Sequence, residues 1–235
     1  SCLSPCGENE MTPVNIAGMA MLAGYDIIAL SDHNSCKNCR ALIAAAENYG
    51  IAAIPAMELT TSEEAHILCI LPTLEAAEDF GLYVRERLPD IKNEPEFFGN
   101  QYIMDEEENI VGEEDRLLVS ATDIGVYDVA RLVKSYGGVA IPAHIDRSSF
   151  SVISNLGFVD NMMGFDVMEI TRNIDPKAFA EEHPELRGKP YIIDSDAHSL
   201  EAMPDACYLI DIEEKTAAAV IEAIRGGRFI NQFPK

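Results

Sequence analysis

The sequence predicts an α/β fold of the barrel type, as a single domain over residues 1–235. Short apolar runs alternate with amphipathic stretches along most of the chain, which is the pattern of strands that alternate with helices. The length fits one barrel-sized domain, and polar residues gather where the apolar runs end. Because the carboxyl ends of the strands form the active face of an α/β barrel, we expect a functional site there.

The first third of the chain has the clearest signals. Thr12-Pro13 is typical of a helix start, with Pro at the first helical position. Only seven residues separate Glu58 from His66, too few for a crossover helix, so the strand near His66 is expected to return as an antiparallel hairpin partner. The expected elements are, in order, a helix over 13–23, a strand over 25–30, a helix over 36–49, a strand over 51–57 and a strand over 65–71.

The middle of the chain, about residues 73–120, interrupts the alternation. It holds the acidic tract 105–108 and the acidic run 113–115. We interpret it as a small acidic insertion made of a helix, a surface hairpin and a loop, because a charge run is usually a solvated face. Regular elements resume afterwards: a helix over 126–136, strands over 139–143, 166–170, 191–193 and 208–212, and a helix over 215–224.

The charge balance is strongly acidic, with 17 Lys+Arg against 40 Asp+Glu and a formal net charge of −23. Binding to nucleic acid or to an anionic membrane needs a basic face, so neither partner is expected. No apolar run reaches the roughly 18 residues that span a bilayer, and the polar first ten residues lack a secretory signal, so we expect a cytoplasmic protein. An anionic substrate would need a local positive charge to overcome the overall field.

Four of the five histidines lie near predicted strand ends. His66 begins the hairpin partner, and the fifth, His183, lies in an acidic helix end and is interpreted as structural. Residues that follow the other strands are Asp32 and His33, Glu58, His144, and Asp196 with His198. Imidazole with carboxylate suits Zn, Mn or Fe, and two such ions clamp a phosphoryl group and lower the pKa of a bound water. The alternative for each histidine alone is a hydrogen-bonded structural role.

Six cysteines are present, and without a secretory signal a disulfide framework is the weaker interpretation. Cys69 and Cys207 lie in apolar runs and are expected in the core. A structural zinc site built from the remaining four is an alternative. Those four are Cys2, Cys6, Cys36 and Cys39.

Four short motifs carry a resemblance that covers nearly the whole chain. They are Ser31-Asp32-His33-Asn34, Met57-Glu58 with His66, Pro142-Ala143-His144-Ile145-Asp146-Arg147, and Ser195-Asp196-Ala197-His198. In order and spacing they resemble the PHP (polymerase and histidinol phosphatase) family. The resemblance implies a distorted (β/α)7 TIM-like barrel, a centre of two or three divalent metal ions and the hydrolysis of phosphate esters.

The resemblance also implies roles for individual residues. Glu58 resembles the bridging carboxylate, and Asp196 a ligand of the first ion. Asp32 is expected to orient His33 rather than to bind metal itself. Arg147 is a candidate phosphate clamp because its planar fork suits a phosphate, with a salt bridge at the rim as the alternative. The expected histidine ligands are His66 and His144 for a second ion, and His33 and His198 for a third position.

One departure from the family pattern is the His-x-His of its first strand, which this sequence does not contain. Residues 1–6 resemble the segment just after that motif, so the first strand is expected to be missing from the sequence given. A further family ligand sometimes follows His-x-His, and Cys6 lies near that place without a fixed register.

The function that follows is a metal-dependent phosphoesterase acting on a small phosphorylated metabolite. Two alternatives stay open at this point. One is hydrolysis of an amide or cyclic ester at the same centre. The other is a non-catalytic regulatory domain with a decayed site. The substrate and the oligomeric state are not determined by the sequence, because the loops that set specificity in such folds vary freely.

Overall fold

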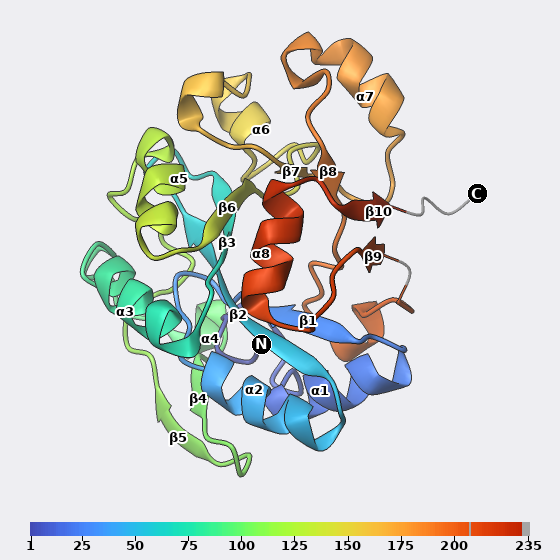
Figure 1. Ribbon diagram of the computed structural model, residues 1–235. Coiled ribbons are helices and arrows are strands. Elements are labelled where there is room, and N and C mark those ends of the chain that lie inside the picture. Colours follow the sequence, from blue (N-terminus) through green and yellow to red (C-terminus); the bar gives the residue numbers. More distant parts are fainter. Residues whose placement is uncertain (207, 232–235) are drawn as a thin grey trace.

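The computed structural model describes residues 1–206 and 208–231, so Cys207 lies outside the described residues. A mixed sheet of four strands, in the order β1-β2-β3-β6, forms the centre of the molecule (Figure 1). β1 and β2 are parallel, and β3 runs antiparallel to both β2 and β6. The bounds of these strands are Ile27–Leu30 for β1, Ala52–Thr60 for β2, His66–Ile70 for β3 and Val139–Pro142 for β6.

The predicted hairpin between the second and third strands is confirmed. Thr60 of β2 faces His66 of β3, and the pairing continues from there to Ala56 and Ile70. The predicted end of the second strand at residue 57 is wrong, since β2 continues to Thr60. The ladder with β3 explains the extra length, and it places Glu58 inside a strand rather than after one.

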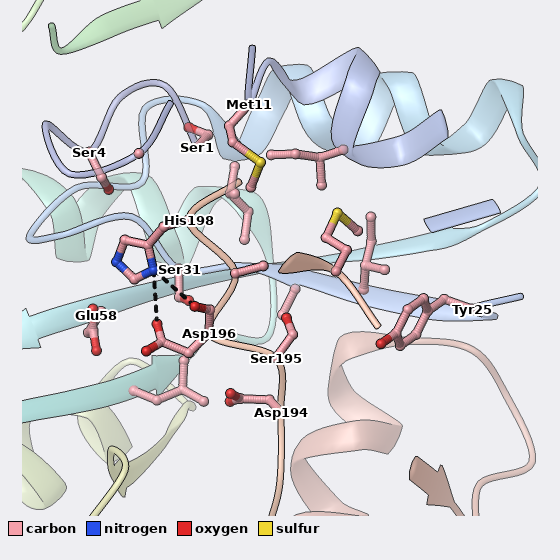
Figure 2. Close-up of a pocket in the computed structure, with 18 of the residues that line it drawn as sticks. Ser1, Ser4, Met11, Tyr25, Ser31, Glu58, Asp194, Ser195, Asp196 and His198 are labelled. Carbon is pink, nitrogen blue, oxygen red and sulfur yellow. Dashed lines mark hydrogen bonds and ion pairs between the residues drawn. The ribbon is translucent and has the colours of Figure 1, made fainter. Parts of the chain in front are cut away.

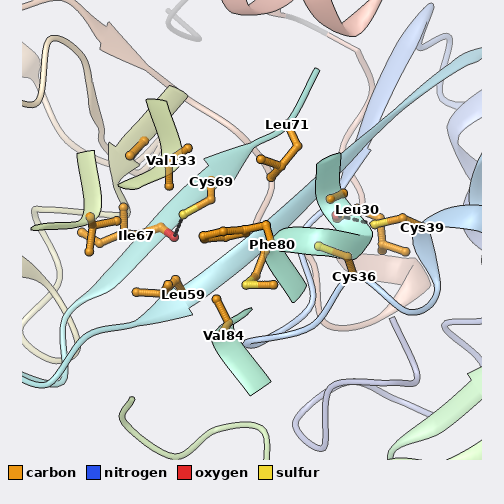
Figure 3. Packing of buried hydrophobic residues seen from close by; sticks show 14 of the residues in the cluster. Leu30, Cys36, Cys39, Leu59, Ile67, Cys69, Leu71, Phe80, Val84 and Val133 are labelled. Atoms are coloured by element: carbon orange, nitrogen blue, oxygen red, sulfur yellow. Dashed lines mark hydrogen bonds between the residues drawn. The ribbon is translucent and has the colours of Figure 1, made fainter. Parts of the chain in front are cut away.

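The sheet has a different apolar core on each face. One face packs against α8 (Ala217–Arg225) through Val220, Ile221 and Ile224. The other face contributes Leu59, Ile67 and Cys69, among others, to a larger cluster that includes Phe80 and Val84 of α3 (Figure 3). The remaining helices are α1 (Pro13–Leu22), α2 (Cys39–Asn48), α3 (Leu74–Arg85), α4 (Pro95–Phe98), α5 (Val126–Ser135), α6 (Val152–Leu156) and α7 (Pro176–Glu182).

In the part of the chain that the structure describes, three further strand pairs lie outside this sheet: parallel β7-β8, antiparallel β9-β10 and antiparallel β4-β5. Within the described residues the strands do not close into a ring, so the predicted barrel is not confirmed, and the fold is a mixed α/β arrangement. A physical reason is the shortness of β7 (Met168–Glu169) and β8 (Tyr191–Ile192), which offer two residues each for pairing. The other strands are β4 (Tyr102–Met104), β5 (Ile110–Glu113), β9 (Tyr208–Ile210) and β10 (Phe229–Asn231), and single 3₁₀ turns lie at Asn161–Met163, Pro184–Leu186 and Leu200–Ala202.

Local signals account for much of this architecture. The Thr12 hydroxyl accepts a hydrogen bond from the amide of Asn15, as expected for the cap of α1. The segment 73–120 contains the helix α3 and the β4-β5 hairpin that its sequence predicts, and also the short helix α4, which was not predicted. The buried Asn38 side chain ties that hairpin to α2, donating to the carbonyl of Tyr102 at 3.0 Å and accepting from the amide of Met104 at 2.9 Å. Among the described helices, none combines the length and apolarity needed to cross a membrane.

Candidate metal centre

Three histidines converge on one buried glutamate. Oε1 of Glu58 lies 3.1 Å from Nδ1 of His66 and 3.4 Å from Nε2 of His144. Oε2 of the same carboxylate lies 3.2 Å from Nδ1 of His33. Their rings meet edge to face, with centroids 5.0 Å apart for His33 and His66 and 5.4 Å apart for His66 and His144.

The sheet positions this group. Glu58 projects from the same face of β2 as the buried Ile54 and Ala56, because side chains alternate along a strand. Beyond the end of β1, His33 forms a parallel bridge with Glu58, and the amide of Asn34 donates to the carbonyl of Glu58 at 3.0 Å. His144 lies two residues after Pro142, the last residue of β6. The three histidines therefore come from one edge of the sheet, where β1 and β6 end and β3 begins.

Backbone strain is concentrated around this group. Four non-glycine residues at or beside it have positive φ: 48° at Asn34, 31° at His144, 54° at Phe150 and 43° at Asp196. Such angles cost an L-residue about 1–3 kcal/mol each and persist where surrounding structure enforces them, most often at functional sites. Phe150 also stacks on His66, with centroids 5.0 Å apart and an interplanar angle of 15°.

A second group lies beside the first. Potential ligand atoms of Cys6, His33 and His198 all lie within 4.8 Å of one another, as do those of His33, Glu58 and His66. Burial alone would raise the pKa of the Cys6 thiol, but hydrogen bonds with His198 and His33 lower it to about 6. The same contact with Cys6 raises the pKa of His198 to about 9.

Acidic side chains line the other side of the site. Asp196 and Asp194 border the same cavity as His198 and Glu58 (Figure 2). Burial, and then the neighbouring Asp196 and Glu58, raise the pKa of Asp194 to about 6. Burial, and then the neighbouring Asp194, also raise the pKa of Glu169. This concentration of carboxylates is favourable only with a compensating positive charge.

Arg147 supplies part of that charge. Its guanidinium Nη2 lies 2.6 Å from Oδ2 of Asp196, and the Arg147 side chain is 44% exposed. The structure therefore places Arg147 at the edge of the site, in a salt bridge. Asp196 belongs to neither of the two compact groups of ligand atoms among the described residues.

The residues fit a divalent metal ion. One carboxylate with several imidazoles is the donor set that Zn, Mn and Fe prefer. Nδ1 of His144 is buried without a hydrogen bond among the described residues. A buried polar nitrogen left in this way is costly, and a cation beside the rings would satisfy it. The pKa of Glu58 is lowered well below its ordinary value because hydrogen bonds with His144 and His66 outweigh the effect of burial, so this carboxylate is ionised and ready to bind.

A cavity of about 310 Å³ adjoins the group. Its lining combines polar side chains, among them Glu58, Asp194 and His198, with apolar ones such as Ile28 and Met203. Such a shape is suited to a small ligand with one polar head.

Most of these residues are ones that the sequence predicts for the site. The structure brings His33, Glu58, His66 and His144 together, and His198 joins them through Cys6. Asp32 is placed differently from the expectation, since its carboxylate accepts from the hydroxyl of Ser4, which in turn accepts from the amide of His33. Its influence on His33 passes through Ser4 and the backbone.

The sequence analysis missed Glu169 as a site residue, and it considered a cysteine zinc site that the structure does not support. Glu169 is a buried acidic residue within the apolar run Val167–Ile170. An acidic residue in a run predicted to be a buried strand could have indicated a site residue. The zinc site from four cysteines finds no support, because no candidate ligand group in the described chain contains more than one cysteine. The thiols of Cys36 and Cys39 instead point to the carbonyl of Ala56 in the core. Cys69 is buried as expected.

No protein-family model matches the chain. No curated protein sequence matches it either. Solved structures do. Endonuclease Q from Pyrococcus furiosus superposes with a TM-score of 0.69 at 18% identity, over 95% of this chain and 53% of that one. A protein from Bifidobacterium adolescentis described as a metal-dependent phosphoesterase has a TM-score of 0.56 at 17% identity, over 95% of this chain and 93% of that one.

An amidohydrolase from Chromobacterium violaceum has a TM-score of 0.58 at 16% identity, over 97% of this chain and 95% of that one. The chain shares the fold of these proteins. The resemblance to a metal-dependent phosphoesterase fold, inferred from four short motifs, is thereby confirmed at the level of fold. The chain spans about half the length of Endonuclease Q.

The prediction that nucleic acid is excluded as a partner is wrong. A second structure with this fold, of Endonuclease Q, holds a 27-mer duplex substrate with an abasic lesion at the active site. Net charge sums over the whole chain, whereas a bound polyanion meets the local field, which an arginine and bound cations can reverse. A net charge of −23 therefore cannot exclude this class of partner.

Proposed function

We propose that this chain is a metal-dependent hydrolase of phosphate esters. The observation that carries the proposal is the convergence of His33, His66 and His144 on the buried Glu58, at one end of a cavity with an arginine at its edge. Clusters of this kind, with ionised carboxylate and buried imidazoles, are the usual basis of metal-assisted hydrolysis.

The metal would be held by Glu58 with His33, His66 and His144. Two or three Zn, Mn or Fe ions are proposed, with Asp196 and His198 as ligands of the further positions. When bound, such ions polarise a phosphoryl oxygen and lower the pKa of a water molecule. The Glu58 carboxylate is already ionised at neutral pH because its pKa is low, so it can bind a cation without first losing a proton.

Arg147 is proposed to bind the phosphate. Its guanidinium has five N–H donors in a planar fork that suits a phosphate. It is half exposed at the edge of the site, where an incoming anion would meet it. The ion pair with Asp196 holds it there in the absence of substrate, so a substrate would exchange one anionic partner for another.

The proposed substrate is a small phosphorylated compound. A cavity of about 310 Å³ matches a small ligand, with the phosphate near the polar lining residues and the remainder against the apolar ones. The second candidate is a phosphodiester in DNA, favoured by the similarity to Endonuclease Q over 95% of this chain. Amide or cyclic-ester hydrolysis is the third, since an amidohydrolase shares the fold.

One panel of assays separates these candidates. The full chain is assayed with added Mn²⁺ or Zn²⁺ against phosphorylated metabolites, a duplex with an abasic site and simple amides. Release of inorganic phosphate that depends on metal and is abolished by Glu58→Gln supports the proposal. Cleavage of the duplex alone identifies an endonuclease instead. If no substrate is hydrolysed at saturating metal, the chain is a non-catalytic domain.

A further inference from the structure

We propose that Asp146 is a positioning residue for both His144 and Arg147, and that it acts by a two-point contact with Thr171. The proposal rests on the proposed function, because that function uses His144 as a metal ligand and Arg147 to bind phosphate. It goes further in explaining how one short turn after β6 presents both groups to the site. Asp146 lies in that turn, between the two residues it would position.

The turn needs support from outside itself. The amide of Arg147 donates to the carbonyl of His144 at 2.9 Å, which closes the turn tightly. His144 has a φ of 31°, in the left-handed region that is unfavourable for a residue with a side chain. Such a conformation persists only where the surrounding structure enforces it. A contact that fixes the next residues of the turn is therefore required.

The side chain of Asp146 supplies that contact by replacing a backbone acceptor. The amide of Ile145 donates to the carbonyl of Glu169 in β7 at 2.9 Å. In a regular parallel ladder the next hydrogen bond would run from the amide of Thr171 to the carbonyl of Ile145. That amide instead donates to Oδ1 of Asp146 at 2.8 Å. The main chain can therefore leave the ladder and turn while the end of β7 keeps its acceptor.

The hydroxyl of Thr171 completes the contact. Its Oγ1 donates to Oδ2 of Asp146 at 2.5 Å, so each carboxylate oxygen accepts from the same residue. Two parallel hydrogen bonds fix the orientation of a carboxylate better than one does. Asp146 belongs to neither compact group of candidate metal ligands in the described part of the chain. Its effect on the site therefore passes through the backbone of the turn.

Both functional groups depend on this backbone. From one side of Asp146, Nε2 of His144 reaches to 3.4 Å from Oε1 of Glu58. From the other side, Nη2 of Arg147 lies 2.6 Å from Oδ2 of Asp196. Loss of the contact with Thr171 would let the turn relax and displace both groups together. A displacement of about 1 Å at a reacting centre costs on the order of 10²-fold in rate.

The test compares Asp146→Ala with Asp146→Asn in the full chain. Alanine removes both acceptors. Asparagine keeps an oxygen for the amide of Thr171, and its NH₂ group can donate to the Thr171 hydroxyl, so the contact survives without the charge. At saturating metal we expect kcat/KM to fall by roughly 10–100-fold in Asp146→Ala and to stay within about threefold in Asp146→Asn. The affinity of the chelator-treated chain for Zn²⁺ should follow the same order.

A matched control separates this role from general stabilisation. Asp175 also accepts a hydrogen bond from a backbone amide, that of Lys177 at 2.9 Å, at the start of α7. Asp175→Ala should lower the thermal stability through loss of a helix cap, but change neither zinc affinity nor kcat/KM. Thr171→Val removes only the hydroxyl and should give a smaller loss than Asp146→Ala, which keeps the proposal testable where that variant does not fold.

A double substitution tests whether Asp146 acts through Arg147. In the background of Arg147→Ala, the further change Asp146→Ala should lower kcat/KM by less than it does alone, because part of its effect has already been removed. Full additivity of the two losses would overturn the proposal.

Two other results would also overturn it. One is a kcat/KM and a zinc affinity that are unchanged in Asp146→Ala. The other is an equal loss in Asp146→Ala and Asp146→Asn, which would mean that the charge of Asp146 is needed in its own right. The zinc titrations do not depend on hydrolysis. A chain that hydrolyses nothing therefore counts against the proposed function alone, while the order of zinc affinities still decides whether Asp146 positions His144.

Discussion

Nδ1 of His66 lies 3.1 Å from Oε1 of Glu58, diagonally across the antiparallel ladder that joins β2 and β3. His66 faces Thr60 in that ladder, and Glu58 precedes Thr60 by two residues, so both side chains project from one face of the sheet. Backbone hydrogen bonds of the hairpin thus hold the carboxylate and the imidazole together. A metal ion would find these ligands already in place, which is what a precise site requires.

Glu58→Gln tests the centre of this arrangement. The amide keeps the size of the side chain but removes the charge around which three imidazoles gather. We expect the affinity for Mn²⁺ or Zn²⁺ to fall by on the order of 10²-fold or more, with a parallel loss of kcat/KM. Titration of the chelator-treated chain with metal measures the first, and phosphate release the second.

Glu78→Gln is the matched control. Glu78 is exposed and pairs with Arg40 at the surface, so its loss should leave metal affinity and activity unchanged. Equal losses in both variants would mean that Glu58 has no particular role in metal binding.

Phe150→Leu tests the support of His66. The phenyl ring stacks on the imidazole, and the carbonyl of Phe150 accepts from the amide of His66 at 2.9 Å. Leucine keeps the backbone contact and removes the stacking, so His66 gains freedom to rotate. We expect roughly tenfold weaker metal binding at the Glu58 group with little change in stability. Phe158→Leu is the control, since Phe158 is equally exposed (48% against 49%) and has no ring contact among the described residues. Identical affinities in Phe150→Leu and the unmodified chain would contradict this role.

Much of the site was predictable because it depends on local patterns. The gap of seven residues between Glu58 and His66 permits a hairpin and little else, and the structure has that hairpin. Alternation along each strand then fixes which residues share a face. The histidines converge because β1 and β6 end at the edge of the sheet where the antiparallel β3 begins.

Other features depend on contacts between distant segments, which a single sequence does not encode locally. The register of Cys6 follows from the hydrogen bonds of Ser4 to His33 and of Glu8 to His198. Whether the strands close into a ring depends on how many residues of β7 and β8 are extended enough to pair. The apolar pattern predicted longer strands, over 166–170 and 191–193, than the structure has. The burial of Glu169 beside Asp194 is likewise a matter of tertiary packing.

Arg147→Ala tests the proposed phosphate clamp. If the guanidinium stabilises charge on the phosphate in the transition state, kcat/KM should fall by on the order of 10²-fold or more at saturating metal. Arg147→Lys should recover only part of the loss, because an ammonium lacks the planar fork. A rise in KM at constant kcat would indicate substrate binding without transition-state stabilisation.

The control for this pair is Arg131→Ala. Arg131 is 84% exposed on α5 and pairs with Asp128 of the same helix, so its removal should change neither constant. Unaltered kcat and KM in Arg147→Ala would reduce the role of Arg147 to its salt bridge with Asp196.

The buried ion pairs of Glu114 make the free energy of unfolding depend on pH. Its side chain is 1% exposed and forms ion pairs with Lys37 and Arg85, the latter at 3.1 Å. Burial opposes ionisation, but these two cations outweigh it and lower the pKa of Glu114 from 4.5 to about 2. Because the folded-state pKa is the lower one, this stabilisation is fully present above about pH 4.5 and is lost as the pH falls toward 2.

Glu114→Gln should therefore cost about 1–3 kcal/mol in the free energy of unfolding at pH 6, allowing for the partial exposure of both cations. The difference from the unmodified chain should shrink steadily between pH 4.5 and the lowest pH at which the chain remains folded. Urea unfolding at pH 6, 4.5 and 3 measures it. Asp115→Asn, which removes an exposed partner of the same Arg85, should change stability by less than about 0.5 kcal/mol at every pH. A difference between Glu114→Gln and the unmodified chain that is the same at all three pH values would show that the carboxylate is not held ionised by these cations.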